Sequence, residues 1–148
     1  MDNHPPLLQV DIVDVGRLIF SGRCQRVTAP AAGGEVCILP RHAALLTHLR
    51  PGTVRVHTAS GDDHFYFVSG GFMEVRHSAV SILADAALRS SEIDRTQAQA
   101  ARDEAEQALR QSHALEDRDL AKLNLARALA QLQVLQHAEI HRLKRDRR

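Results

Sequence analysis

The sequence predicts an N-terminal antiparallel β-sandwich of about ten short strands, followed by a C-terminal antiparallel two-helix hairpin. Up to about Asp85, apolar residues tend to alternate with polar ones, and turn-forming residues recur at short, regular intervals. Beyond Asp85 there is no glycine or proline, and apolar residues recur at helical spacing. We therefore expect two domains in this chain of 148 residues, a sandwich over residues 1–87 and a helical hairpin over residues 88–148.

Alternation identifies the individual strands. In LLQVDIVDV, Leu8, Val10 and Ile12 fall on one side of an extended chain, and TVRVHT repeats the pattern with apolar residues at 54 and 56. The segment SGDD at 60–63 predicts a hairpin turn into the strand HFYFV. The segment SGG at 69–71 is interpreted as a second tight hairpin turn, because it lacks the glycine spacing and the helix start of a phosphate-binding loop.

Two helices follow. Ser91 and Asp94 have the spacing of a capping box at the start of the first, and SHA at 112–114 predicts the connector. Acidic residues near the start of the second helix and basic residues at its end suit the helix dipole. The first helix is expected to bury a mostly alanine stripe and the second a leucine stripe: Ile93, Gln97, Ala101, Ala105 and Ala108, then Leu125, Leu129, Leu132 and Leu135.

A hairpin of this composition buries little apolar area, so its interface contributes on the order of a few kcal/mol at about 25 cal/mol per Å². Helices held this weakly can dock on the sandwich or detach from it and engage something else. The hairpin is therefore a candidate moving part.

Composition excludes several classes of function. The formal charge of +1 gives no overall attraction to nucleic acid or anionic membrane, and 3% aromatic residues without tryptophan cannot build base-stacking platforms. No signal peptide and no apolar stretch of membrane-spanning length is visible. Cys24 and Cys37 are expected to be reduced thiols rather than a disulfide framework. We therefore expect no nucleic-acid partner and no direct membrane contact.

No grouping of residues indicates chemistry. His137 and His141 share a helix face, but the segment lacks the H-E-x-x-H pattern and a third ligand, so no metal is expected. His42 has no neighbouring nucleophile or carboxylate, and neither lysine belongs to a P-loop. We predict an interaction protein without catalytic residues, metal or cofactor. The basic tail HRLKRDRR leaves RNA or lipid binding as an alternative.

Five motifs occur in one order: IFSG at 19–22, GEVCILPRHAALLT at 34–47, LRPGTVRV at 49–56, VSGGFMEV at 68–75 and VSILAD at 80–85. Together with SSEIDRTQA at 90–98 they resemble the epsilon subunit of F-type ATP synthases over almost the whole chain, with alanine at position 44 where the family has proline. The resemblance implies a non-catalytic subunit that helps couple proton flow to ATP synthesis.

The resemblance also implies partners: the gamma subunit, the c-ring and the alpha and beta catalytic subunits, at the cytoplasmic side of a bacterial inner membrane. It assigns c-ring and gamma docking to Glu35, Pro40, His42, Leu45 and Leu46. It further implies that the hairpin can extend into the catalytic head and inhibit hydrolysis. The inhibitory contacts are then expected from Arg127, Arg142, Lys144 and Arg145.

Some members of this family sense ATP through the motif Ile/Leu-Asp-x-x-Arg-Ala. Here Ile93, Asp94 and Ala98 match, but Gln97 replaces the arginine. Two supporting arginines align with Glu104 and Gln131, which leaves only Arg127. Weak ATP binding or none is therefore expected, and a nucleotide-sensing module is the alternative interpretation of the hairpin.

Overall fold

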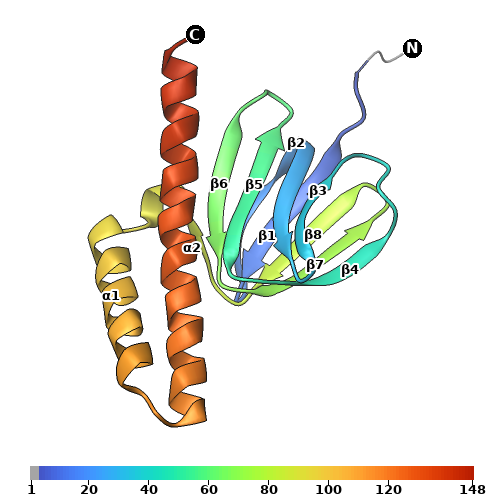
Figure 1. The fold of residues 1–148 in the computed structure, drawn as a ribbon. Helices are drawn as coiled ribbons and strands as arrows, with labels where there is room; N and C mark the ends of the chain where they lie inside the picture. The colour runs from blue at the N-terminus through green and yellow to red at the C-terminus, as the bar shows by residue number, and fades with distance from the viewer. Residues whose placement is uncertain (1–3) are drawn as a thin grey trace.

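The computed structural model describes residues 4–148, which form a β-sandwich followed by a helical hairpin (Figure 1). The strands are β1 (Leu8–Asp14), β2 (Arg17–Ala31), β3 (Gly34–Ile38), β4 (Leu45–Leu49), β5 (Gly52–Thr58), β6 (Asp63–Val68), β7 (Gly71–Arg76), β8 (Ala79–Ala84) and β9 (Ala87–Arg89). They are followed by the 3₁₀ helix η1 (Ser90–Glu92) and the helices α1 (Arg95–Gln111) and α2 (Leu115–Asp146).

The predicted fold class is confirmed, with one difference in strand pairing. The strands follow the order β1-β8-β7-β4-β2-β5-β6-β9, and β3 pairs with β2. Strand β2, 15 residues long, pairs with β1 through its first half and with β3 and β5 through its second, so it joins the two layers. Strands β1 and β8 pair in parallel. Alternation within a strand does not encode the direction of a distant partner, so this pair was not predicted.

The core lies between the two layers and follows the predicted alternation. Leu8, Val10 and Ile12 are fully buried, as are Val54 and Val56 on β5. The SGDD segment forms the β5–β6 hairpin as expected, since Asp63 and His57 are paired across it. These apolar residues from both layers form one contiguous cluster with Met73, Val75 and Ile82 of β7 and β8.

The interpretation of SGG as a hairpin turn is wrong. Strand β6 pairs with β5 and β9, whereas β7 pairs with β4 and β8, so Ser69 and Gly70 carry the chain from one layer to the other. Gly71 has φ of 126°, and a Cβ there would overlap the backbone of Leu83 and Ala84. Glycine is required here because the crossing chain lies directly against β8.

The helices start and stop close to the predicted positions, but the capping box is wrong. Asp94, not Ser91, is the N-cap of α1, and its side chain accepts a hydrogen bond from the Gln97 backbone N–H at 3.1 Å. The connector 112–114 is confirmed, and the charges at both ends of α2 follow the expected polarity. Helix α1 packs along the first half of α2, whose second half lies against β5 and β6 (Figure 1).

Small residues rather than leucines make the buried face of α2. The residues buried there are Ala121, Ala128, Ala130 and Val134, whereas Leu129 is 46% exposed. On α1 the buried residues are Ala98 and Ala105, so the two helices meet through alanines as expected, although Gln97 and Ala101 are exposed. The leucine stripe is confirmed only in part. Leu125 and Leu132 are half-buried and Leu135 packs toward the sandwich, whereas Leu129 is exposed, because α1 and the sandwich contact α2 from different sides.

A second, smaller apolar cluster attaches the hairpin to the sandwich. Phe65 and Phe67 of β6 pack against Ala130 and Val134 of α2, and Ile93 closes the cluster from the segment before α1. Strand β6 is therefore buried on both faces, one toward the sandwich core and one toward α2.

Candidate docking surfaces and the sandwich–hairpin junction

An exposed apolar row crosses the sheet on the face away from the hairpin. Register pairs Leu18 of β2 with Val13 of β1, Val13 with Leu83 of β8, Leu83 with Phe72 of β7, and Phe72 with His48 of β4. Cross-strand pairs point to the same face, so these five side chains form one row, about 19 Å across at roughly 4.8 Å per strand. We call it the outer apolar row.

Large side chains of the outer apolar row lie in water. Leu18 is 60% exposed, Leu83 57% and Phe72 45%, and the ring of Phe72 stacks on His48 with centroids 4.3 Å apart. Strands β4, β7 and β8 lie on the far side of the sandwich from α2 (Figure 1). A contiguous apolar row on an otherwise polar face is typical of a protein interface.

Sequence reasoning missed most of this row. The signal lies where alternation breaks, because Phe72–Met73 and Ile82–Leu83 place apolar residues on both faces of their strands. An outward apolar residue beside an inward one indicates a strand with two apolar faces. Which outward residues become neighbours depends on register, and register between distant strands is not evident in the sequence.

The loop before β4 adjoins this face. Leu46 is 71% exposed and pairs with Glu74 one row away from Phe72, whereas Leu45 is half-buried and packs on the core. Pro40 and His42 lie in the loop between β3 and β4, which the Arg41 backbone N–H ties to Ser78 Oγ at 3.1 Å. The structure thus gathers four of the five predicted docking residues around the start of β4.

Glu35 is separate from that group. It lies on β3 and lines two hollows of about 390 and 180 Å³ that are closed on one side by α2, where His137 also lines both. Its carboxylate therefore faces the hairpin side of the sandwich, while the loop that carries His42 lies beyond the other end of β3.

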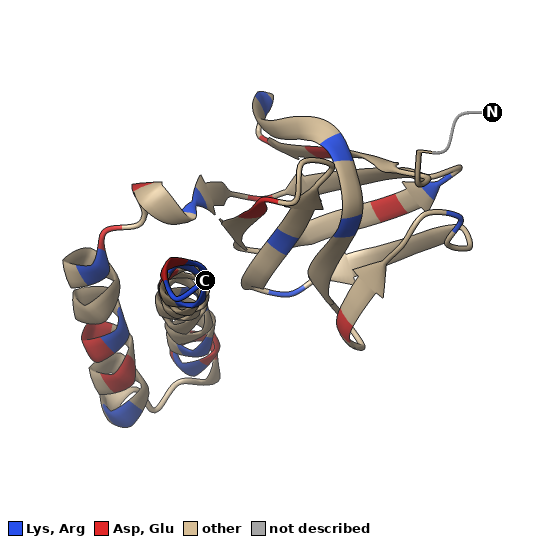
Figure 2. Ribbon diagram, turned by 90° about the horizontal axis from the view of Figure 1, so that it is seen from above, with Lys and Arg blue, Asp and Glu red and all other residues tan. Residues whose placement is uncertain are grey.

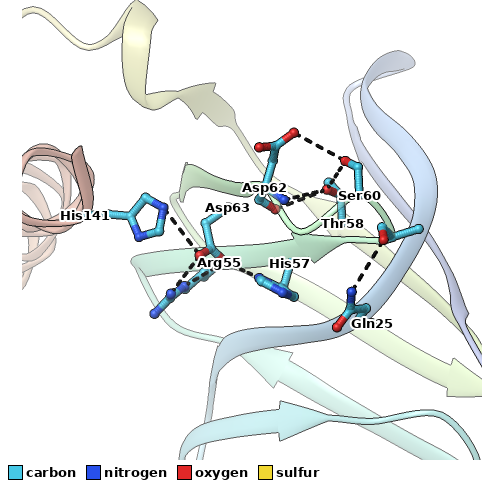
Figure 3. Close-up of polar contacts among 9 residues, drawn as sticks. Gln25, Arg55, His57, Thr58, Ser60, Asp62, Asp63 and His141 are labelled. Carbon is cyan, nitrogen blue, oxygen red and sulfur yellow. Dashed lines mark hydrogen bonds and ion pairs between the residues drawn. The ribbon is translucent and has the colours of Figure 1, made fainter. Parts of the chain in front are cut away.

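Asp63, at the start of β6, is the polar centre of the sandwich–hairpin junction (Figure 3). Its carboxylate accepts two hydrogen bonds from Arg55, at 3.2 and 3.0 Å, and lies 2.9 Å from His57 Nδ1. His141 Nε2 of α2 lies 3.4 Å from its second oxygen, and the same imidazole packs on Phe65.

The Asp63 side chain is only 5% exposed. Burial by itself raises the pKa of Asp63, but the hydrogen bonds from Arg55 and His57 outweigh burial and lower that pKa to about 2. Asp63 is therefore ionised at neutral pH and attracts cationic or donor groups from two domains. Sequence reasoning had treated it only as a turn residue.

The four arginines and lysines predicted to contact the catalytic head do not share one surface. Arg142, Lys144 and Arg145 are exposed near the end of α2, which Figure 2 views end-on between α1 and the sandwich. Arg127 lies instead about three turns from the start of α2, and its Nε is buried without a hydrogen-bond partner within residues 4–148.

The residues of the degenerate ATP motif have structural roles here. Ile93 is buried at the junction, Asp94 caps α1 and Ala98 is buried, whereas Gln97 is exposed. A hollow of about 330 Å³ between α1 and α2 is lined by alanines and by the polar residues Glu104, Asn124, Arg127 and Gln131. The positions aligned with the family's supporting arginines are thus neighbours in space, with one positive and one negative charge.

Between residues 4 and 148, no cluster of three or more His, Cys, Asp or Glu side chains is arranged to hold a metal ion. Neither helix in that range is long and apolar enough to cross a membrane.

Comparison with known families agrees with this architecture. A family model described as the beta-sandwich domain of the ATP synthase Delta/Epsilon chain matches residues 7–90, and one described as the long alpha-helix domain of that chain matches residues 91–136. The chain belongs to the ATP synthase delta/epsilon family. It is a non-catalytic subunit of the epsilon type, which belongs to the central stalk and serves ATP synthesis. The resemblance drawn from its motifs is therefore confirmed.

Similar proteins match this chain over nearly their whole length. The ATP synthase epsilon chain of Alkalilimnicola ehrlichii is 46% identical over 129 residues, 87% of this chain and 92% of that protein. The ATP synthase epsilon chain 2 of Ralstonia nicotianae is 43% identical over 143 residues, 97% of this chain and 99% of that protein.

Solved structures share the fold. A chain of the Euglena gracilis mitochondrial ATP synthase, from a structure of its OSCP, F1 and c-ring, superposes with a TM-score of 0.81 at 24% identity. That match covers 90% of this chain and 84% of the other.

Proposed function

We propose that the sandwich docks this subunit on the rotor, with the outer apolar row seated on the gamma subunit and the loop before β4 directed to the c-ring. The observation that carries the proposal is the row itself, because Leu18, Phe72 and Leu83 are large and exposed on the face that the hairpin leaves free. Burying such side chains stabilises a complex by about 1.5–3 kcal/mol each when burial is complete.

The test is binding of full-length variants to the cognate catalytic head depleted of this subunit. Phe72→Ser and Leu83→Ser are each expected to weaken binding roughly tenfold, because each removes an apolar contact worth about 1.4 kcal/mol. Leu115→Ser is the matched control, since Leu115 is 73% exposed but lies on α2. Equal affinities for all three variants would contradict docking through this row.

The hairpin is proposed to inhibit ATP hydrolysis when it leaves the sandwich. Its end carries Arg142, Lys144 and Arg145 in exposed positions, where they are available to acidic loops of the beta subunits. The apolar contact between α2 and β6 is confined to the cluster around Phe65 and Phe67, so departure costs chiefly the burial of that cluster, which contacts in the catalytic head must offset. Charge complementarity at an exposed surface weakens with salt, so inhibition should decline as ionic strength rises.

To test this step, ATP hydrolysis by the depleted head is measured after adding back either the full chain or a chain that ends at Arg89. Suppression by the full chain alone establishes the hairpin as the inhibitor. If both chains bind equally and neither slows hydrolysis, inhibition is refuted while docking stands.

The proposed location, peripheral on the cytoplasmic side of a bacterial inner membrane, predicts that everted membrane vesicles expose the subunit to added antibody.

ATP is proposed to bind this hairpin weakly or not at all. In the hollow between α1 and α2, Arg127 is the single positive charge and Glu104 opposes an anionic triphosphate. Calorimetry with ATP should give no sub-millimolar affinity that depends on Arg127. Glu104→Arg together with Gln131→Arg should raise the affinity if charge is the missing element, and micromolar ATP binding by the unmodified chain that is lost in Arg127→Gln would refute the reasoning.

A further inference from the structure

A hollow of about 280 Å³ lies where the last turns of α2 meet β6 and the segment that joins β9 to α1. Three arginines line it, Arg89 from β9 and Arg142 and Arg145 from α2. The hydroxyl-bearing residues Ser90 and Ser91 of η1 line the same hollow. We call it the C-terminal hollow, and its positive groups come from both domains.

The charges in the C-terminal hollow are not balanced within the described chain. Arg89 is satisfied, because it donates to the Ile19 carbonyl at 2.9 Å and lies 3.7 Å from a carboxylate oxygen of Glu92. The guanidinium groups of Arg142 and Arg145, one turn apart on α2, form no hydrogen bond or ion pair within residues 4–148.

The one carboxylate that lines the hollow does not neutralise these arginines. Asp63 is already engaged by Arg55 through two hydrogen bonds and by His57 and His141. Its side chain is 5% exposed and is turned to these partners (Figure 3). The open part of the C-terminal hollow therefore presents guanidinium and hydroxyl donors, without a free acceptor of opposite charge.

We propose that the C-terminal hollow binds a phosphate-class oxyanion, either free phosphate or pyrophosphate or the terminal phosphate of a larger molecule. Guanidinium groups bind phosphate oxygens through paired, charge-assisted hydrogen bonds, and serine hydroxyls supply further donors. The anion bridges Arg142 and Arg145 of α2 to Ser90 and Ser91 of the sandwich-side segment. Its site exists only while α2 is docked.

The consequence for the hairpin follows by linkage. A ligand that binds one arrangement alone favours that arrangement by a factor of about 1 + [L]/Kd. The anion thus holds the hairpin on the sandwich and occupies two of the arginines proposed to contact the catalytic head. Binding stands independently of the proposed function, whereas this effect on inhibition rests on it.

The C-terminal hollow is distinct from the hollow between α1 and α2. Arg127 of that hollow lies 15 residues before Arg142 on the same helix, which corresponds to roughly 22 Å at 1.5 Å per residue. Substitutions can therefore address the two sites separately.

The experiment measures binding of inorganic phosphate to the isolated full chain by calorimetry at pH 7 and constant ionic strength, with chloride as the reference anion. The double variant Arg142→Gln with Arg145→Gln is expected to weaken phosphate binding at least roughly tenfold, the loss of about 1.4 kcal/mol of charge-assisted hydrogen bonding. The control variant, Arg147→Gln with Arg148→Gln, removes the same two charges from the same helix end, but neither residue lines the hollow. Circular dichroism verifies that each variant is folded.

Hydrogen exchange adds a second readout. Phosphate should slow hydrogen exchange of the backbone amides of residues 138–146 in the unmodified chain. In the double variant it should leave the exchange rates of these amides unchanged. Failure of phosphate to bind above the chloride background, or equal loss of phosphate binding in the control variant and the double variant, overturns the proposal.

Parallel titrations with pyrophosphate and ATP identify the source of the phosphate group. Binding of phosphate or pyrophosphate that depends on Arg142 and Arg145 supports a free anion, and ATP binding with the same dependence supports a nucleotide. ATP binding that is instead lost in Arg127→Gln places the anion in the hollow between α1 and α2 and overturns the proposal. Because no catalytic head is present, failure of the proposed docking or inhibition leaves this result unaffected.

Discussion

Replacing Asp63 by asparagine removes the charge at the sandwich–hairpin junction while preserving side-chain size. The pKa of Asp63 lies at about 2, against 3.8 for an unperturbed aspartate. The difference, at 1.36 kcal/mol per pKa unit, corresponds to about 2 kcal/mol of stability from the ionised carboxylate. Asp63→Asn should therefore lower the free energy of unfolding by about 2 kcal/mol at pH 7, or roughly 5–10 °C in Tm.

The pH dependence distinguishes this cause from a packing defect. Because the folded-state pKa is depressed, the stabilisation is complete above pH 3.8 and is lost as pH falls from 3.8 through 2. Urea denaturation at several pH values should show the two proteins converging over that interval. Asp62→Asn, the same change one residue earlier in the exposed turn, should alter stability by less than about 0.5 kcal/mol. Equal stability of Asp63→Asn and the unmodified chain at pH 7 would refute the reasoning.

Three further perturbations test packing and access. Gly71→Ala should destabilise the sandwich on the order of 3 kcal/mol in urea denaturation, because of its positive φ and its approach to β8; unchanged stability would contradict that geometry. Ala98→Leu should cost about 1–3 kcal/mol by overpacking the α1–α2 contact, visible as helical signal lost at lower temperature, whereas unchanged melting would show a looser interface. Iodoacetamide should modify the exposed Cys37 and spare Cys24, because Cys24 is buried and burial raises the pKa of its thiol to about 11. Detection of modification at both cysteines by peptide mass spectrometry would contradict this.

The sequence was most informative where one local rule determined the outcome. Burial of Leu8, Val10 and Ile12 follows from period-two alternation, and the connector at 112–114 follows from the interruption of helical spacing. The start of α1 was misplaced although its signal was present, since Asp94 precedes Gln97 by three residues and is itself a good N-cap. Local chemistry thus carries the signal, but Ser91 and Asp94 are both good N-cap residues and the sequence alone does not distinguish them.

Features that depend on distant pairing were not predictable. Gly70 and Gly71 identify a turn, but whether the chain then pairs with β6 or crosses to the other layer depends on strands far away in sequence. The outer apolar row has the same origin, because Phe72 and Leu83 become neighbours only through the β7–β8 register. The Asp63 cluster likewise requires α2 to return to the sandwich, which places His141 beside a turn residue 78 positions earlier.

The composition of α2 explains how one helix can serve two arrangements. Its own buried residues are small, so undocking exposes little apolar area of α2 itself, although it also uncovers Phe65 and Phe67 of β6. Large side chains, including Leu120, Leu129 and Leu143, already lie in water while the helix is docked. A partner that buries even two of them gains about 3–6 kcal/mol, comparable with the roughly 5.5 kcal/mol needed to invert a 99:1 population. The docked arrangement is therefore held by a few groups, chiefly Phe65 and Phe67 and the contact between Asp63 and His141, and these are the positions at which a ligand or partner can shift the balance.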